Sequence, residues 1–418
     1  MSITISDFID TNGYIQLPSC KGYSSSDVDN ILTQIIQAIR NKRITFPYKY
    51  NRLTTKIESI CEMFQNLTMY QPISIVDSPT HTQPYRIVHK SSILREKMKH
   101  KRGQYKMHDK VYRRMIWQEQ PTDYDTIDQL TDYFTESQRM SAGRIDKKYK
   151  TPLDLWEMAS SHDIDTMREM LKTAILSDEG LTPRTFRDAF WKTGLEANSF
   201  KTTVASSVFW YFDAQRILDI SAGWGDRLIA AIAHRAERYV AYDPNISLKS
   251  GHDEIIRTFA QDYAHQYEVR YSKFETGDLH DETFDLIFTS PPYFNFEQYV
   301  KGSSEQSMDV YPRFNMWFVK FLCASLFKAW AALAVNGNMV IHISDIGDDN
   351  QAIVEPMILY VLGYCHCSGF DGVMGTVGYS GKPRPMWVFH KYADETIDMA
   401  KKARIELAQY YPGIQSLL

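Results

Sequence analysis

A turn with two hydrogen-bond acceptors and an aromatic ring follows an apolar run late in the chain. Residues 284–288 read Phe-Asp-Leu-Ile-Phe, and residues 289–294 read Thr-Ser-Pro-Pro-Tyr-Phe. The two prolines fix φ and lack N–H groups, so the turn is rigid and its carbonyl oxygens can accept hydrogen bonds. Ser290 adds a side-chain acceptor and Tyr293 adds a flat ring. Such a turn suits the exocyclic amino group of a planar base, because the acceptors orient the amino group while the ring stacks on the base.

A glycine turn lies upstream of this motif. Residues 217–227 read Ile-Leu-Asp-Ile-Ser-Ala-Gly-Trp-Gly-Asp-Arg, which predicts a strand, a turn and the start of a helix. Gly223 and Gly225 permit a tight turn and a close approach of the backbone to a ligand. Leu228 stands where the dinucleotide pattern has its third glycine, which disfavours NAD. Asp243 ends the next predicted strand and is placed to bind two ribose hydroxyls; capping of the following helix is the alternative role.

Together the two motifs resemble the S-adenosylmethionine-dependent methyltransferases that modify the amino nitrogens of bases. The signature of that family is Asp/Asn/Ser-Pro-Pro-Tyr/Phe after the fourth strand, and the resemblance covers residues 200–393. It implies that the target amino group is held by Ser290, Pro291, Pro292 and Tyr293. It implies S-adenosylmethionine as the cofactor, bound by Asp219, Ser221, Ala222, Gly223, Gly225, Asp243, Phe274, Glu275 and Asp278.

The resemblance also implies how these residues act. Phe274 would flank the cofactor adenine, and Glu275 or Asp278 would read its amino group; an ordinary polar turn is the alternative. The base nitrogen would attack the sulfonium methyl in line, while Ser290 and the Pro291 carbonyl orient it. The chain has no Pro-Cys pair, which argues against methylation of a ring carbon. In the resembled family, Thr-Ser-Pro-Pro-Tyr occurs mostly in N4-cytosine enzymes, so cytosine is favoured and N6 of adenine stays open.

A basic segment precedes both motifs. Between Arg86 and Arg114 the chain has eleven lysines and arginines and two acidic residues, a local charge of +9 in a protein of net charge −4. Interleaved tyrosines strengthen the prediction of a nucleic-acid contact, with DNA favoured over RNA, although a solvated helix face is the alternative. The residues expected to contact phosphates are Lys97, Lys99, Lys101, Arg102, Lys106, Lys110, Arg113 and Arg114.

Strands and helices alternate from residue 215 onward, which is typical of a parallel sheet covered by helices. The expected fold class is therefore α/β, a Rossmann-like class I methyltransferase sheet preceded by a mostly helical N-terminal region. The expected domains are residues 1–150 (basic and mostly helical), 151–200 (a helical connector) and 201–418 (the methyltransferase domain). The expected strands are residues 216–220, 238–243, 267–272, 284–289, 337–343, 364–369 and 385–391.

Composition restricts the remaining classes. The chain has no apolar run near the ~18 residues that a membrane span requires, and its N-terminus lacks the basic and apolar regions of a secretory signal. Its five cysteines are scattered, and Cys365-His366-Cys367 is too tightly spaced for a structural zinc pair, so no metal is expected. An intracellular, soluble protein follows, and the order of its parts is similar to methyltransferases of large DNA viruses and phages. Two alternatives remain open: an RNA adenine methyltransferase, and an inactive scaffold subunit that keeps the fold. The sequence leaves the oligomeric state open.

Overall fold

The computed structural model describes most of the chain as two compact units. The described residues are 3–50, 52, 55–70, 74–76, 112–116, 127–145, 151–160, 164–345, 352–367, 369–377, 383–393, 397–412 and 414. The helical unit comprises Met1–Ile57, Thr135–Asn198 and Phe296–Gly302, and the sheet unit comprises Glu58–Phe134, Ser199–Asn295 and Ser303–Leu418. The chain thus passes between the units more than once. The chain re-enters the sheet unit at Ser199, next to the boundary expected at residue 200, and no change of unit falls at the boundary expected at residue 150.

The helical unit consists of short helices around their own apolar core. In α1 (Ser25–Arg40), the side chain of Ser24 caps the helix by accepting a hydrogen bond from the N–H of Asp27 at 3.2 Å. The apolar residues of α1 recur at helical spacing and are buried, as the sequence predicts. The other elements are η1 (Ile5–Phe8), α6 (Pro152–Glu157), η2 (Met158–Ser160), α7 (Asp165–Ile175), α8 (Pro183–Thr193), and the paired strands β3 (Gly143–Arg144) and β8 (Glu297–Gln298). Helix α5 (Asp132–Met140) begins in the sheet unit and ends in the helical unit.

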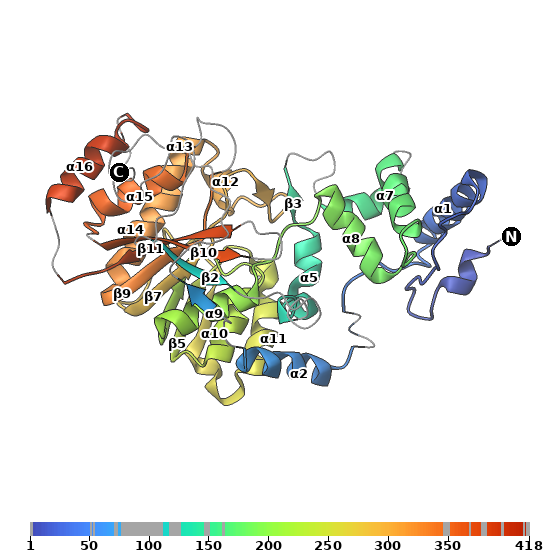
Figure 1. Cartoon of the computed structure of the whole chain (residues 1–418), viewed down its shortest axis with the longest axis horizontal. Coiled ribbons are helices and arrows are strands. Elements are labelled where there is room, and N and C mark those ends of the chain that lie inside the picture. Colours follow the sequence, from blue (N-terminus) through green and yellow to red (C-terminus); the bar gives the residue numbers. More distant parts are fainter. Residues whose placement is uncertain are drawn as a thin grey trace. The chain divides into compact units, whose positions relative to one another are not determined.

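One sheet dominates the second unit (Figure 1). Its order is β1-β2-β10-β11-β9-β7-β4-β5-β6. Strands β6, β5, β4, β7 and β9 are parallel, and β11 runs antiparallel to both of its neighbours. The bounds are β1 (Ser74–Val76), β2 (Tyr112–Ile116), β4 (Arg216–Asp219), β5 (Arg238–Tyr242), β6 (Tyr267–Arg270), β7 (Phe284–Thr289), β9 (Leu333–Ile341), β10 (Gly369–Val377) and β11 (Pro383–His390). The Rossmann-like fold class expected from the sequence is confirmed.

Helices lie on both faces of this sheet, as Figure 1 shows. On one side are α9 (Thr202–Phe212), α10 (Asp226–His234) and α11 (Lys249–Phe259). On the other side, α14 (Ala324–Ala332) continues the π-helix η5 (Trp317–Cys323), and α15 (Val354–Tyr364) and α16 (Ile397–Leu407) pack nearby. The remaining helices are α2 (Ile57–Thr68), η3 (Ile246–Leu248), η4 (Gln261–Gln266), α12 (Ser307–Val310) and α13 (Phe314–Met316). In the part of the chain that the structure describes, no helix is both long and apolar enough to cross a membrane.

Two expectations about this sheet are corrected. The strand expected at residues 364–369 is wrong, because α15 runs to Tyr364 and the strand β10 begins at Gly369. Residues 364–369 read Tyr-Cys-His-Cys-Ser-Gly, and this short alternation of apolar and polar residues predicts a strand although the segment connects α15 to β10. The end of the basic segment is also not helical: residues 112–116 form β2, which pairs in parallel with β10. Residues 86–111 lie outside the described residues.

The strand register places β2 in line with the first motif. Thr289 pairs with Ile341, Ile341 with Trp387, Trp387 with Val373, and Val373 with Tyr112. We call these five residues the Thr289 row. Strands β10 and β11 continue past this row to the pair Val377 and Pro383, and β1 and β2 add to the sheet alongside that extension. At about 3.3 Å per residue, these strands therefore extend roughly 13 Å beyond the carboxyl end of β7.

Candidate active site at the switch point of the sheet

The two sequence motifs meet between β4 and β7. These strands are neighbours in the sheet although they are not consecutive in the chain, and ligands of α/β sheets bind at the carboxyl ends of such strands. The Ser221 hydroxyl lies 3.1 Å from the Ser290 carbonyl oxygen and 2.8 Å from Thr289 Oγ1. Because a carbonyl can only accept, Ser221 donates to Ser290 and accepts from Thr289. The glycine turn and the Ser-Pro-Pro-Tyr turn are thus joined directly.

The side chain of Ser290 has a histidine partner that the sequence did not assign. His342 Nδ1 lies 3.1 Å from Ser290 Oγ, and the His342 N–H donates to the Thr289 carbonyl at 2.9 Å. Phe200 packs edge-on against the imidazole, with the ring centroids 5.3 Å apart. Pro291 is buried, whereas Ser290, Pro292 and Tyr293 are partly exposed. This partnership depends on how β7 and β9 pair, which no local pattern in the sequence encodes.

Asp219 supports the glycine turn from inside. It is fully buried, and its Oδ1 accepts from the Ser221 N–H at 3.1 Å. Its Oδ2 accepts from Arg227 Nε at 2.6 Å and from the Tyr239 hydroxyl at 3.0 Å. Burial, and then the nearby Asp219 carboxylate, raise the pKa of Tyr239 well above its usual value, so this hydroxyl stays a donor. The Asp219 carboxylate therefore holds the turn in place, and its expected contact with a cofactor stays a prediction.

Asp243 connects the end of β5 to the same turn. Its Oδ2 accepts from the Gly223 N–H and its Oδ1 accepts from the Asn245 N–H, each at 2.9 Å. Each oxygen keeps a second lone pair for a further donor. Burial raises the pKa of Asp243 to about 6. Asn245, and not Asp243, caps the next helical turn, because its side chain accepts from the Ser247 N–H at 3.1 Å.

A buried histidine fixes the other side of the glycine turn. His252 Nε2 lies 3.0 Å from the Gly223 carbonyl, and its Nδ1 lies 2.9 Å from the Tyr271 hydroxyl. Burial lowers the pKa of His252 to about 4, so the ring is neutral near pH 7. Because the carbonyl can only accept, Nε2 carries the ring proton and Nδ1 accepts from Tyr271. Gly225 has a φ of +101°, and a Cβ there would lie 2.9 Å from Ile255 Cδ1, so this position requires glycine.

The turn after β6 differs from what the resemblance implies. Phe274 is 2% exposed and packs edge-on against Tyr242, with the ring centroids 5.0 Å apart. Lys328 Nζ lies 4.7 Å from the centroid of the Phe274 ring and donates to the Phe274 carbonyl at 2.6 Å and to the Gly277 carbonyl. Phe274 is therefore part of the core, and its expected position beside an adenine ring stays a prediction. The expectation that Glu275 or Asp278 reads the adenine amino group also stays a prediction.

Three acidic residues that follow the carboxyl ends of the strands differ in burial and in hydrogen-bond partners. Glu275 is partly buried, which raises its pKa, and it accepts from the Tyr311 hydroxyl at 3.2 Å. Asp278 is exposed, and the hydrogen bond from the His280 N–H lowers its pKa. Asp345 accepts from the N–H groups of Ile353 and Val354 at 2.8 and 2.9 Å and so caps the start of α15. Among the described residues, no group of histidines, cysteines and acids is arranged to hold a metal ion.

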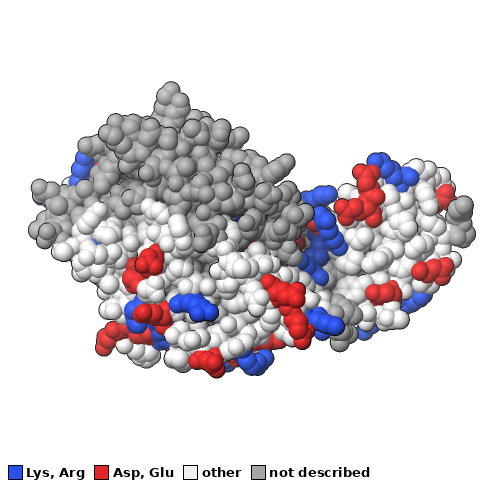
Figure 2. Space-filling view, turned by 60° about the horizontal axis from the view of Figure 1, so that its bottom comes forward, with Lys and Arg blue, Asp and Glu red and all other residues white. Residues whose placement is uncertain are grey.

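The predicted phosphate-contacting residues are not tested by these contacts. Lys97, Lys99, Lys101, Arg102, Lys106 and Lys110 lie outside the described residues, and Arg113 and Arg114 lie in β2. On the face that Figure 2 shows, described acidic and basic side chains lie side by side. Arg238 and Arg270, for example, both pair with Glu268 and Glu282. The nucleic-acid prediction therefore depends on the basic segment itself.

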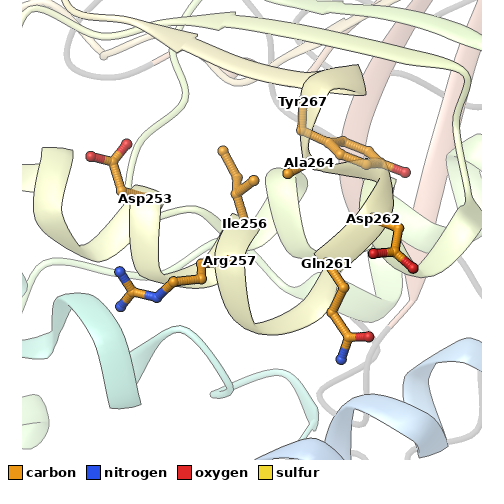
Figure 3. Close-up of a pocket in the computed structure, with 7 residues that line it drawn as sticks. All are labelled: Asp253, Ile256, Arg257, Gln261, Asp262, Ala264 and Tyr267. Carbon is orange, nitrogen blue, oxygen red and sulfur yellow. The ribbon is translucent and has the colours of Figure 1, made fainter.

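A depression in the surface lies beside the amino end of β6. It has a volume of about 560 Å³ and is lined by Asp253, Ile256, Arg257, Gln261, Asp262, Ala264 and Tyr267 (Figure 3). These residues belong to α11, to η4 and to the first position of β6. The carboxyl ends of β4 and β7, where the two motifs meet, are at the other edge. This depression is therefore separate from the candidate active site.

Comparisons with known proteins give distant structural likenesses. No protein-family model matches the chain, and no curated protein matches it. A SAM-dependent O-methyltransferase from Thermotoga maritima is 12% identical, with a TM-score of 0.31, and the match covers 48% of this chain and 69% of that one. An rRNA methylase from Streptococcus thermophilus is 14% identical (TM-score 0.29; 43% and 88% covered). TrmN from Thermus thermophilus is 12% identical (TM-score 0.33; 50% and 66% covered). These likenesses concern the fold of about half of the chain.

Proposed function

We propose that the chain transfers a methyl group from S-adenosylmethionine to the exocyclic amino group of a base in DNA. N4 of cytosine is the first choice and N6 of adenine the second. The observation that carries this proposal is a pair of hydrogen bonds at Ser221, which donates to the Ser290 carbonyl at 3.1 Å and accepts from Thr289 Oγ1 at 2.8 Å. They bring the glycine turn and the Ser-Pro-Pro-Tyr turn together at one switch point, where a cofactor held by the first can face a base held by the second.

The residues around the glycine turn fit the proposed cofactor. A Cβ added to Gly223 would have no atom closer than 3.9 Å, so the space beside the turn is open. The second lone pairs of Asp243 are suited to the two ribose hydroxyls, and the partly buried Glu275 is suited to the adenine amino group. The Gly223–Gly225 backbone would meet the methionine end. S-adenosylmethionine supplies a methyl group on a positively charged sulfur, and these residues position it.

The Ser-Pro-Pro-Tyr turn would then act on the base. Ser290 Oγ and the Pro291 carbonyl would accept the two N–H hydrogens, which turns the nitrogen lone pair toward the methyl carbon. The new N–C bond forms as the S–C bond breaks, its electrons stay on sulfur, and the nitrogen then gives up one proton. Tyr293 would stack on the base, which must leave its helical stack to reach the turn.

The Thr289 row supports nucleic acid as the substrate. Tyr112, which lies near the C-terminal end of the basic segment, is in that row four strand spacings from Thr289. At about 4.8 Å per spacing, the two residues are roughly 19 Å apart. The C-terminal end of the basic segment therefore lies in the sheet at the same height as the end of β7, next to the strands that extend beyond it. We propose that residues 86–114 contact the phosphate backbone on this side.

Methyl transfer by the Ser290→Ala variant tests the proposal. The full chain is incubated with S-adenosylmethionine and either DNA or RNA oligonucleotides, and methylated nucleosides are quantified. We expect the wild type to methylate DNA, and we expect S290A to lose at least about 100-fold in rate while still binding the cofactor. Ser250 is exposed on α11, so Ser250→Ala is the matched control and should keep full activity. Activity on RNA alone would reverse the substrate choice, and failure to bind S-adenosylmethionine would favour an inactive scaffold.

A further inference from the structure

We propose that His342 is a positioning residue that takes the hydroxyl hydrogen of Ser290 and so leaves Ser290 Oγ as an acceptor for the target amino group. This inference rests on the proposed function. It concerns one hydrogen bond, the 3.1 Å contact between His342 Nδ1 and Ser290 Oγ. It also offers a reason why a serine can stand at this position.

The backbone fixes His342 opposite Ser290. The His342 N–H donates to the Thr289 carbonyl at 2.9 Å, directly after the Thr289–Ile341 pair of β7 and β9. The backbone of His342 is thereby locked to the residue that precedes Ser290. This connection does not depend on the imidazole, so a substitution of the side chain leaves it in place.

Aromatic packing fixes the imidazole ring. Phe200 lies edge-on to the imidazole at 5.3 Å and edge-on to Phe288 at 5.6 Å. The Arg227 guanidinium lies 5.1 Å from the centroid of the Phe200 ring, and Arg227 is itself bound to the buried Asp219. The imidazole is therefore held by the same group of side chains that supports the glycine turn. A ring held in this way keeps its hydrogen-bond direction without a large entropic cost.

The chemistry of serine requires such a partner. A carboxylate or an amide oxygen at this position can only accept, but a hydroxyl carries its own hydrogen and can point it at the target. Thr289 donates to Ser221, and Ser221 donates to the Ser290 carbonyl. The hydrogen bonds next to Oγ therefore have fixed donors and acceptors. A neutral imidazole with its proton on Nε2 accepts at Nδ1. The Ser290 hydrogen then points to His342, and the lone pairs of Oγ face the amino group.

Three substitutions of His342 test the inference through kcat and KM. His342→Ala removes the acceptor, and we expect kcat to fall about tenfold while KM for S-adenosylmethionine stays within twofold. In His342→Asn an amide oxygen can take the place of Nδ1, so we expect kcat to recover to within about threefold of the wild type. His342→Phe keeps the ring packing without an acceptor, and it should be as slow as H342A. Thermal melting of each variant confirms that it is folded.

A double variant separates positioning from packing. If His342 acts through Ser290, then S290A/H342A is no slower than S290A alone. Additive losses, an H342F variant as fast as the wild type, or an H342N variant as slow as H342A would each overturn the inference. A wild type that binds S-adenosylmethionine but methylates no base would instead refute the proposed function. An active wild type with an equally active H342A would refute only the role of His342.

Discussion

The affinity for S-adenosylmethionine should depend on pH through Asp243. Burial raises the pKa of this carboxyl to about 6, and only its ionised form accepts hydrogen bonds from both ribose hydroxyls. At pH 5 about one molecule in eleven is ionised, whereas at pH 7.5 nearly all are, so the apparent Kd should rise about tenfold on acidification. His252 does not produce this change, because its pKa is about 4 and it stays mostly neutral over the range.

Calorimetric titrations at pH 5 and pH 7.5 measure this effect directly. Below pH 6 the measured heat of binding should also vary with the ionisation enthalpy of the buffer, since binding ionises Asp243 and releases a proton. The control is Asp243→Asn, which has no carboxyl to titrate: its affinity should be weak at both values and nearly independent of pH. A wild-type affinity that changes less than twofold between the two values would refute the assignment of Asp243 to the ribose. An equal pH dependence in D243N would place the titrating group elsewhere.

Three further substitutions probe the supports of the site. Arg227→Met leaves the buried Asp219 carboxylate without its cation, so the free energy of unfolding in urea should fall by about 3–5 kcal/mol; a loss under 1 kcal/mol would contradict the buried pair. Gly225→Ala combines a φ of +101° with a Cβ 2.9 Å from an isoleucine methyl, so we expect a loss of about 1–3 kcal/mol and weaker cofactor binding; unchanged melting would count against this geometry. Lys328→Met removes the hydrogen bonds to the turn that contains Glu275, so KM for S-adenosylmethionine should rise several-fold with kcat little changed, and a loss confined to kcat would show that Lys328 acts elsewhere.

The sequence was sufficient where local pattern and tertiary environment agree. Strands β4, β5 and β7 are short, mostly apolar runs that end in polar turns, and the register brings Ser221 and Ser290 together as the motifs predict. The role of Asn245 as a cap was also readable, because capping depends only on neighbours in the chain. The fold class and the position of the candidate site were therefore accessible without coordinates.

The sequence was insufficient where a role depends on distant partners. Asp219 has the type and spacing of a cofactor contact, but its bonds from Arg227 in α10 and Tyr239 in β5, both to Oδ2, depend on the tertiary fold. Phe274 has the type of a stacking residue, but Lys328 from α14 closes the core over it. The pairing of β2 with β10 joins segments more than 250 residues apart, and no local pattern encodes such a partner.

The most direct measurement follows the methyl group itself. The full chain is incubated with DNA and S-adenosylmethionine that carries a deuterated methyl group, and the digested nucleosides are separated and identified by mass spectrometry. We predict a label on the exocyclic nitrogen of cytosine or adenine with the wild type, and none with S290A. A label on a ring carbon, a sugar or a phosphate, or no label from a wild type that binds the cofactor, would contradict it.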